Sequence, residues 1–146
     1  MLYGSHFAKM DDVGRLRLPA DIKNAIEQKW GRHLFITSLD GTEIKIYPLT
    51  VWQDIARRLE DGPSFEPAVI KFTDLTSYYG RVASLDGQGR TVIPPLLRET
   101  ASLDGECILL GKINHLSLWN RQVFVEKRLQ SPITPEELRT IASFGR

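Results

Sequence analysis

Apolar and polar residues follow each other along the chain with two periods, and each period predicts one kind of element. Ile22, Ala25 and Ile26 are three and four residues apart, which is typical of one face of a helix. Short apolar runs predict two pairs of strands, at 33–37 and 43–47 and at 106–110 and 115–119. Asp40-Gly41 predicts a hairpin turn within the first pair. Helices combined with hairpins place the chain in the α+β class.

A short pattern of residues occurs twice at a constant spacing. Four residues return 75 positions later: Asp11, Gly14, Arg15 and Pro19 recur as Asp86, Gly89, Arg90 and Pro94. Such agreement at one offset is hard to obtain by chance, so the sequence predicts an internal duplication. A short helix, a strand pair and a second helix are predicted after each occurrence, with the second helices at 50–60 and 121–130.

The remaining segments lie between and after these two units. Residues 61–67 are rich in turn-forming residues, and 68–77 predict one further helical segment. Thr134 and Pro135 form a helix-start signature in the tail. We therefore expect a first repeat at 1–60, a linker with a helical segment at 61–77, a second repeat at 78–130 and a C-terminal tail at 131–146.

The repeated pattern predicts a tight turn that carries arginines on its outer face. Gly14 and Gly89 tolerate the positive φ that a chain reversal requires. The strands that flank the first turn are expected at 7–9 and 15–18. Because side chains alternate along a strand, Arg15 and Arg17 should face outward while Leu16 and Leu18 face inward. In the second unit Val92 occupies the position that corresponds to Arg17, so Arg90 is expected to stand there without a second arginine. We therefore expect the first turn to contribute more to binding affinity than the second.

An Asp-x-x-x-Arg turn has a structural and a functional interpretation. As an exposed ion pair it would contribute about 0–1 kcal/mol to stability. Its recurrence among diverged neighbours favours a binding role instead. Arginine can donate two parallel hydrogen bonds to a phosphate or to guanine, and a two-stranded ribbon fits the major groove of DNA. The candidate DNA contacts are Arg15 and Arg90, supplemented by Arg17 and Lys9, with Asp11 and Asp86 orienting the arginines or accepting from cytosine.

Composition limits where a nucleic-acid site can lie. The 146 residues carry a net charge of only +1, so binding must come from a local basic patch or from several chains acting together. One cysteine, Cys107, allows no intramolecular disulfide, which fits a reducing compartment. The first residues lack the pattern of a signal peptide, and no apolar stretch approaches the length of a membrane span. We expect a cytoplasmic protein.

Other chemistries find little support in the sequence. The three histidines and Cys107 are scattered, so no metal or other cofactor is expected, and Cys107 is interpreted as a core residue. The carboxylates form no repeated pair suited to acid–base catalysis, so we expect no enzyme. Trp30, Trp52 and Trp119 could stack on bases, but their positions beside helix and strand ends favour packing in the core.

The two turn segments, 10–19 and 85–94, resemble the signature segments of the MraZ family. Residues 46–52 and 109–120 are similar to the ends of its two repeats, so the resemblance covers about residues 1–130. Members are bacterial transcriptional regulators built of two SpoVT/AbrB-like repeats. The resemblance implies a duplicated SpoVT/AbrB-like swapped-hairpin β-barrel with flanking helices. It also implies that Arg15 and Arg90 contact DNA, with Asp11 and Asp86 as their partners.

The resemblance also implies partners and a role. The partners are double-stranded DNA carrying short direct repeats in a promoter, and further copies of the chain in a ring-like homo-oligomer. The implied role is repression of the division and cell-wall gene cluster, including the protein's own gene, by a nucleoid-associated protein. Two features depart from the family. Lys71 is the only basic residue at 68–74, where members carry several arginines, and the tail beyond Ser131 shows no clear counterpart.

A second function fits the same predicted fold. AbrB-like repeats also occur in antitoxins, which bind DNA and hold a toxin through their tail. Leu138, Ile141 and Phe144 lie near helical spacing in the tail of this chain and could dock such a partner or a neighbouring subunit. Antitoxins commonly carry one repeat per chain, whereas two are predicted here. The regulator is therefore the main interpretation, and an AbrB-type antitoxin is the alternative.

Overall fold

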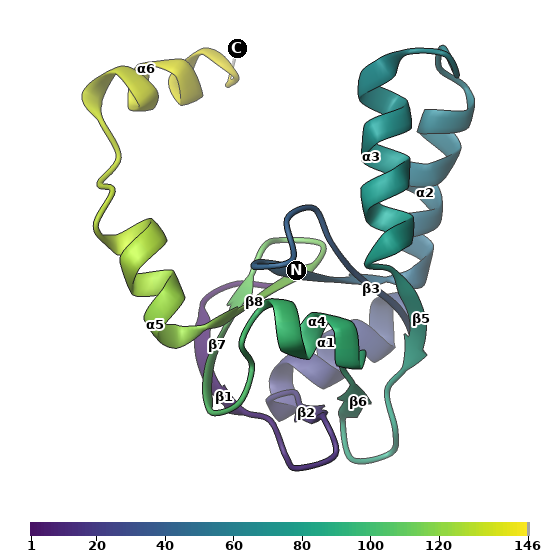
Figure 1. Cartoon of the computed structure of the whole chain (residues 1–146), viewed down its shortest axis with the longest axis vertical. Coiled ribbons are helices and arrows are strands. Elements are labelled where there is room, and N and C mark those ends of the chain that lie inside the picture. Colours follow the sequence, from purple (N-terminus) through teal and green to yellow (C-terminus); the bar gives the residue numbers. More distant parts are fainter. Residues whose placement is uncertain (146) are drawn as a thin grey trace.

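The computed structural model describes residues 1–145 and confirms the α+β class (Figure 1). Arg146, the last residue of the predicted tail, lies outside the described residues. The strands are β1 Ser5–Lys9, β2 Arg15–Arg17, β3 His33–Ser38, β4 Ile44–Pro48, β5 Arg81–Ser84, β6 Arg90–Val92, β7 Glu106–Gly111 and β8 Leu116–Asn120. The helices are α1 Ala20–Trp30, α2 Leu49–Glu60, α3 Pro67–Tyr78, α4 Pro95–Thr100, α5 Arg121–Phe124 and α6 Pro135–Ser143.

The predicted elements are present, and their ends follow local chemistry. Both predicted hairpins form, as β3–β4 and β7–β8. Gly41 has a φ of 78° in the first hairpin turn, where a side chain would be strained. The helix predicted at 121–130 starts as α5 and continues as a π-helical segment, Val125–Leu129. Helix α6 begins with a capping box in which Thr134 and Glu137 bind each other's backbone N–H groups.

Strand pairing interleaves the two predicted units in one sheet. The six-stranded sheet has the order β1-β7-β8-β4-β3-β5. Strand β1 pairs with β7 of the second hairpin, and β5 pairs with β3 of the first. Each unit therefore supplies a strand that extends the hairpin of the other. Strands β4 and β8 pair in the middle and join the two hairpins.

The remaining two strands form a separate antiparallel ribbon, β2–β6. The strands that flank each turn are therefore not ladder partners of each other. Strands β1 and β2 meet at a single bridge between Met10 and Leu16, whereas the ladder of β2 is with β6. The ladder is extended by backbone hydrogen bonds from Leu18 to Gly89 and from Ile93 to Gly14, each 2.9 Å long. Both Asp-x-x-x-Arg turns consequently lie side by side at one end of the molecule (Figure 1).

The core lies between the ribbon, helix α1 and the six-stranded sheet. Ile22 and Ile26 are buried, so the predicted apolar face of α1 is confirmed. Leu16 and Ile93, on the inner side of the ribbon, belong to the same buried cluster. Full burial of such a side chain contributes about 1.5–3 kcal/mol. Buried Cys107 also belongs to this cluster, which confirms its prediction as a core residue.

The tryptophans pack against the protein as predicted. Trp119 is buried, and Trp30 packs against the main core cluster. Trp52 stacks on Phe35 with ring centroids 4.7 Å apart. The Trp52–Phe35 stack fixes helix α2 against strand β3.

Two helical extensions project from the body of the protein (Figure 1). The α2–α3 hairpin carries Phe65 at its tip, and α5 leads through an extended segment to α6. Phe65 and Phe144 are 91% and 76% exposed, which leaves large apolar side chains on both extensions. No helix within residues 1–145 is both long and apolar enough to cross a membrane.

Candidate nucleic-acid interface

Each predicted turn is closed by its own aspartate. In the first turn, Asp11 Oδ1 accepts hydrogen bonds from the backbone N–H groups of Val13 (3.0 Å) and Arg15 (2.8 Å). Its other oxygen, Oδ2, accepts from Arg15 Nε at 2.7 Å. A backbone bond from Gly14 N–H to Asp11 O, 3.0 Å long, completes the reversal. One carboxylate thus shapes the turn and holds the guanidinium.

The second turn repeats this geometry atom for atom. Asp86 Oδ1 accepts from the N–H groups of Gln88 (2.8 Å) and Arg90 (2.9 Å), and Oδ2 accepts from Arg90 Nε at 2.9 Å. An arginine has five N–H donors, and a bond through Nε leaves the four on its two Nη atoms for a ligand. Arg15 and Arg90 side chains are 41% and 29% exposed, so solvent and ligands reach them.

The hydrogen bonds lower the pKa of both aspartates. The backbone N–H of Arg90 is the largest cause of the lowered pKa of Asp86, which falls to about 2. The backbone N–H of Arg15 acts in the same way on the pKa of Asp11. Both carboxylates are therefore ionised at neutral pH and keep their arginines in place. As exposed ion pairs alone, they would add little stability.

The ribbon brings arginines of both turns onto one outward face. Leu16 and Thr91 form the central pair of the ladder and point inward, with 0% and 2% exposure. Arg15 then lies opposite Val92, and Arg17 lies opposite Arg90. The predicted outward orientation of Arg15 and Arg17 is confirmed, because their neighbours Leu16 and Leu18 are buried.

Arg17 belongs with the second turn, which corrects the prediction from sequence. Arg17 lies across from Arg90 and donates a hydrogen bond from Nη2 to Gln88 Oε1 at 3.1 Å. Gln88 is part of the second turn, so the prediction that Arg90 stands there without a second arginine is wrong. The reason is that β2 pairs with β6 and not with its neighbour in sequence. Like charges directly opposite each other are unfavourable on a ribbon. A bound anion would relieve that repulsion.

Two basic residues near the turns were missed by the reasoning from sequence. An ideal Cβ on Gly89 would lie 2.9 Å from Lys23 Cδ, and one on Gly14 would lie 2.5 Å from Arg98 Cζ. The side chains of Lys23 and Arg98 therefore lie across the turn of the other unit. Arg98 is also held by a 3.1 Å hydrogen bond from Nε to Ile93 O. The sequence did carry a signal for these two basic residues, because Lys23 and Arg98 are separated by the same 75 positions as the two turns.

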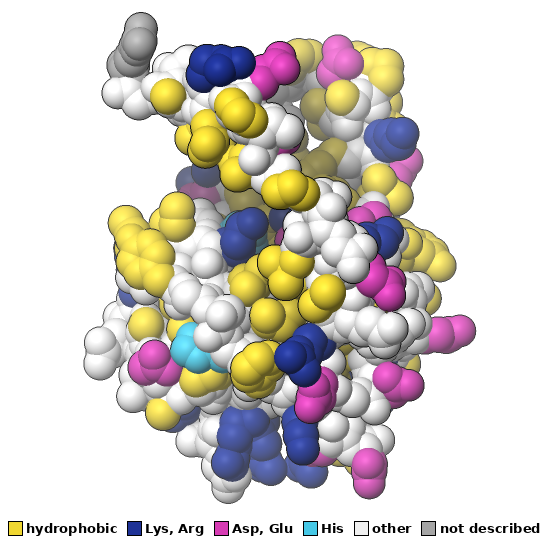
Figure 2. All heavy atoms as spheres, turned by 90° about the vertical axis from the view of Figure 1, so that its left-hand side faces the viewer, with side chains coloured by type: hydrophobic (Ala, Val, Ile, Leu, Met, Phe, Trp, Pro, Cys, Tyr) yellow, Lys and Arg dark blue, Asp and Glu magenta, His cyan; other side chains and the backbone are white. Residues whose placement is uncertain are grey.

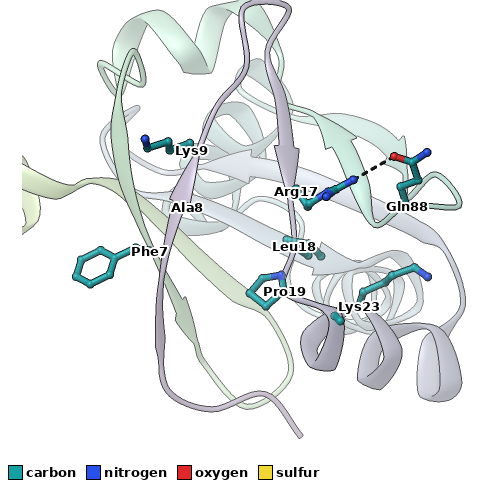
Figure 3. Close-up of a pocket in the computed structure, with 9 residues that line it drawn as sticks. Phe7, Ala8, Lys9, Arg17, Leu18, Pro19, Lys23 and Gln88 are labelled. Carbon is teal, nitrogen blue, oxygen red and sulfur yellow. Dashed lines mark hydrogen bonds between the residues drawn. The ribbon is translucent and has the colours of Figure 1, made fainter.

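Lys9 lies across a groove from the ribbon and not on it. The groove has a volume of about 760 Å³, and its lining includes Lys9, Arg17 and Lys23 (Figure 3). Lys9 is on β1, whereas Arg17 and Lys23 come from β2 and α1 on the opposite side. Figure 2 shows Lys and Arg side chains gathered at this end of the molecule. The structure thus brings the six predicted residues to one end, with each aspartate bound to its arginine.

The site is suited to binding anions and not to holding a metal. Its donors are guanidinium and ammonium groups, which match phosphate oxygens and the acceptors of guanine. Within residues 1–145, no three or more His, Cys, Asp or Glu side chains are grouped so as to hold a metal ion. Burial, the largest cause, raises the pKa of the Cys107 thiol to about 11, so this thiol is protonated at neutral pH.

Comparison with known proteins gives consistent matches. A family model described as "MraZ protein, putative antitoxin-like" matches residues 82–139. A protein of Acidobacterium capsulatum named Transcriptional regulator MraZ is 38% identical over 145 residues, and the match covers 99% of each chain. A protein of the same name from Koribacter versatilis is 37% identical over 146 residues, again 99% of each chain. Another from Azotobacter vinelandii is 32% identical over 127 residues, covering 86% of this chain and 83% of that protein.

These matches also correct the view of the tail. The sequence alone indicated no family counterpart beyond Ser131. Matches that cover 99% of this chain extend into that region, and the family model itself reaches residue 139. The segment beyond Ser131 therefore has a counterpart in the sequences of these relatives.

Proposed function

Since this chain belongs to the MraZ family of transcriptional regulators, we propose that it binds double-stranded DNA in a sequence-specific way through the outward face of the β2–β6 ribbon. The observation that carries the proposal is the placement of Arg15, Arg17 and Arg90 together on that face. A two-stranded ribbon is narrow enough to enter the major groove. Two of the three guanidiniums are held by aspartates through Nε, so they are oriented before DNA arrives.

The proposed contacts divide by chemistry. Arg15 and Arg90 are the main contacts, with forked Nη donors that match guanine O6 and N7 or a phosphate. Arg17 and Lys9 add contacts to the phosphate backbone, and Asp11 and Asp86 position the arginines. Lys23 and Arg98, which lie over the two turns, would strengthen the positive electrostatic potential around the ribbon. This local cluster explains how a chain of net charge +1 could bind DNA.

The fold we propose is the duplicated SpoVT/AbrB-like swapped-hairpin β-barrel with flanking helices. Its support is the interleaved pairing, in which β1 joins β7 and β5 joins β3. The unit boundaries proposed from sequence, 1–60 and 78–130, divide the elements into two matching sets joined by the 61–77 linker. The central ladder pair, Leu16 opposite Thr91, is itself 75 positions apart, so the ribbon has an approximate twofold axis there.

The proposed biological role is repression of the division and cell-wall gene cluster, including the protein's own gene, by a cytoplasmic, nucleoid-associated regulator. The proposed operator consists of short direct repeats in the promoter. The proposed active form is a ring-like homo-oligomer, supported by the exposed apolar side chains on both helical extensions. A ring that presents several ribbons to adjacent repeats gains affinity through effective concentration.

The test is a gel shift with DNA from upstream of the protein's own gene, with the mass of the complex measured by light scattering. Wild type is expected to bind, and binding should weaken steeply with salt. The double variant Arg15→Ala/Arg90→Ala should lose about 2 kcal/mol or more of binding, roughly thirtyfold. Arg57→Ala is the matched control, because Arg57 also forms an exposed ion pair, with Asp54, but on α2. Equal binding by wild type and the double variant would refute the ribbon as the DNA site.

The antitoxin alternative is favoured by one observation. Leu138, Ile141 and Phe144 on α6 are 53%, 52% and 76% exposed, so a toxin could dock there. Deletion of residues 131–146 separates the two functions. If a second protein co-purifies with the full chain and is lost from the truncated chain, while DNA binding is kept, the antitoxin is favoured. If the truncation lowers only the mass of the oligomer, the tail serves self-association.

A further inference from the structure

We infer that the ribbon binds DNA with a fixed polarity, because only one of its two flanks can lie along a phosphate backbone. This inference rests on the proposed function and concerns how the same site is used. The approximate twofold axis of the ribbon would by itself allow DNA to bind in two equivalent orientations. The side chains beside the ribbon break that symmetry.

The flank next to the first unit is basic. Its groove of about 760 Å³ lies between β1 and the start of α1 and is lined by Lys9, Arg17 and Lys23 (Figure 3). The other lining side chains are apolar or neutral, and none within the described residues is acidic. Lys23 Nζ forms an ion pair with Glu27 Oε1, which lies 3.3 Å away on the next turn of the helix. Lys9 and Arg17 form no ion pair within residues 1–145. Glu106 lies opposite Lys9 on β7, and its carboxylate is paired with Arg121 at 3.0 Å.

The flank next to the second unit is acidic. The positions 75 residues after Lys9 and Arg17 are Ser84 and Val92, which carry no charge. A depression of about 480 Å³ lies where the first turn meets the second unit. It is lined by Asp12 of that turn and by Glu99 and Asp104 of the second unit, as well as by Asp11 and Arg98. Asp11 is neutralised by Arg15, and Arg98 remains as one cation against three carboxylates. A phosphate backbone placed here would meet net repulsion.

These two flanks have consequences for the operator. Phosphate contacts set most of the salt dependence of binding, so the basic flank must face a DNA backbone. Each ribbon therefore reads its site in one direction. Ribbons bound to head-to-tail operator units would therefore all point the same way, whereas ribbons bound to inverted units would point in opposite directions.

Directed cleavage of DNA measures this polarity. Cys107 is the one cysteine and is buried, so a cysteine introduced at exposed Asn24 can be labelled alone with an iron chelate. Asn24 follows Lys23, which lines the basic groove, in helix α1. On the fragment used for the gel shift, cuts should fall on one side of each protected unit. Equal cuts on both sides, with normal affinity, would overturn the inference. Absence of binding would instead count against the proposed function.

Charge variants test the cause of the polarity. Lys9→Ser and Arg17→Val, which introduce the residues of the second unit, should each lower the salt slope by about one unit. Neutralising the acidic flank with Asp12→Asn/Glu99→Gln/Asp104→Asn should raise affinity and produce a second set of cuts in the labelled protein. If this triple variant leaves the one-sided pattern unchanged, the acidic flank does not set the polarity. An unchanged salt slope in Lys9→Ser and Arg17→Val would exclude the basic groove as the backbone contact.

Discussion

Arg17 lies directly across the two-stranded ribbon from Arg90, so that two like charges face each other on an exposed surface. Gln88 accepts a hydrogen bond from Arg17 at 3.1 Å, and Asp86 holds Arg90 at 2.9 Å. These polar partners fix both guanidiniums and keep them side by side. An arrangement that costs stability in the free protein, and that would be relieved by an anion, is typical of a binding surface.

Arg17→Ala is therefore expected to separate stability from binding. Removal of one of two facing charges should leave the free energy of unfolding unchanged or raise it by a few tenths of a kcal/mol, within the range of about 0.2–1 kcal/mol for cross-strand pairs. DNA affinity should fall by about 1–3 kcal/mol. Urea unfolding and fluorescence anisotropy measure the two quantities. A parallel loss of stability would show that Arg17 is a structural residue of the ribbon.

Val92→Arg should have the opposite effect on binding. Val92 is 51% exposed and lies opposite Arg15, so an arginine there would complete the symmetric set of four. The expected result is tighter binding with a salt slope steeper by about one unit, and slightly lower stability from the new like-charge pair. Val82→Arg is the matched control, because Val82 is 59% exposed but lies on β5. If the two variants gain affinity equally, net charge and not position is responsible.

The elements of this fold could be predicted because their signals are local. The apolar spacing of Ile22 and Ile26 predicted a buried helix face, and Thr134 predicted the start of α6 through its capping box. Strand partners could not be predicted in the same way. The pairing of Leu16 with Thr91 joins residues 75 positions apart and depends on the whole chain's packing.

The candidate site shows the same division between local and distant information. Hydrogen bonding within each turn follows from the Asp-x-x-x-Arg spacing alone, and the structure has it twice. The neighbours of the turns come from elsewhere: Arg17 beside Arg90, Lys23 over Gly89 and Arg98 over Gly14. Each of these contacts results from the pairing of β2 with β6. Reasoning from sequence assigned Arg17 to the first turn because it had no means of placing the second turn beside it.

Gly14→Ala should destabilise the protein through the first turn. Gly14 has a φ of 84°, which costs a residue with a side chain about 1–2 kcal/mol. The added Cβ would also meet the Arg98 guanidinium at 2.5 Å and displace it. We expect a lower free energy of unfolding in urea together with weaker DNA binding. Gly87→Ala is the control in the second turn, since Gly87 has no positive φ and open space around its Cβ position. Equal losses in both variants would contradict the strain argument.

Asp86 makes the stability of the second turn depend on pH. Hydrogen bonds, chiefly from the Arg90 backbone N–H, lower its pKa to about 2 in the folded protein, whereas the unfolded value is about 4. A lowered pKa means that the unfolded chain takes up the proton first. The stabilisation is thus complete above about pH 4 and is lost as the pH falls toward 2. The Tm difference between wild type and Asp86→Asn should therefore be constant near neutral pH and shrink below pH 4.

Asp12→Asn serves as the control for that titration, because it removes a negative charge beside the first turn where no hydrogen bond holds Asp12 within residues 1–145. Its Tm should differ little from that of wild type at neutral pH. DNA binding adds a second readout at neutral pH. Without the carboxylate, Arg90 loses the acceptor that fixes its Nε, so Asp86→Asn should bind more weakly although no DNA-contacting donor has been removed. If Asp86→Asn keeps full affinity, the aspartate shapes the turn without positioning the arginine.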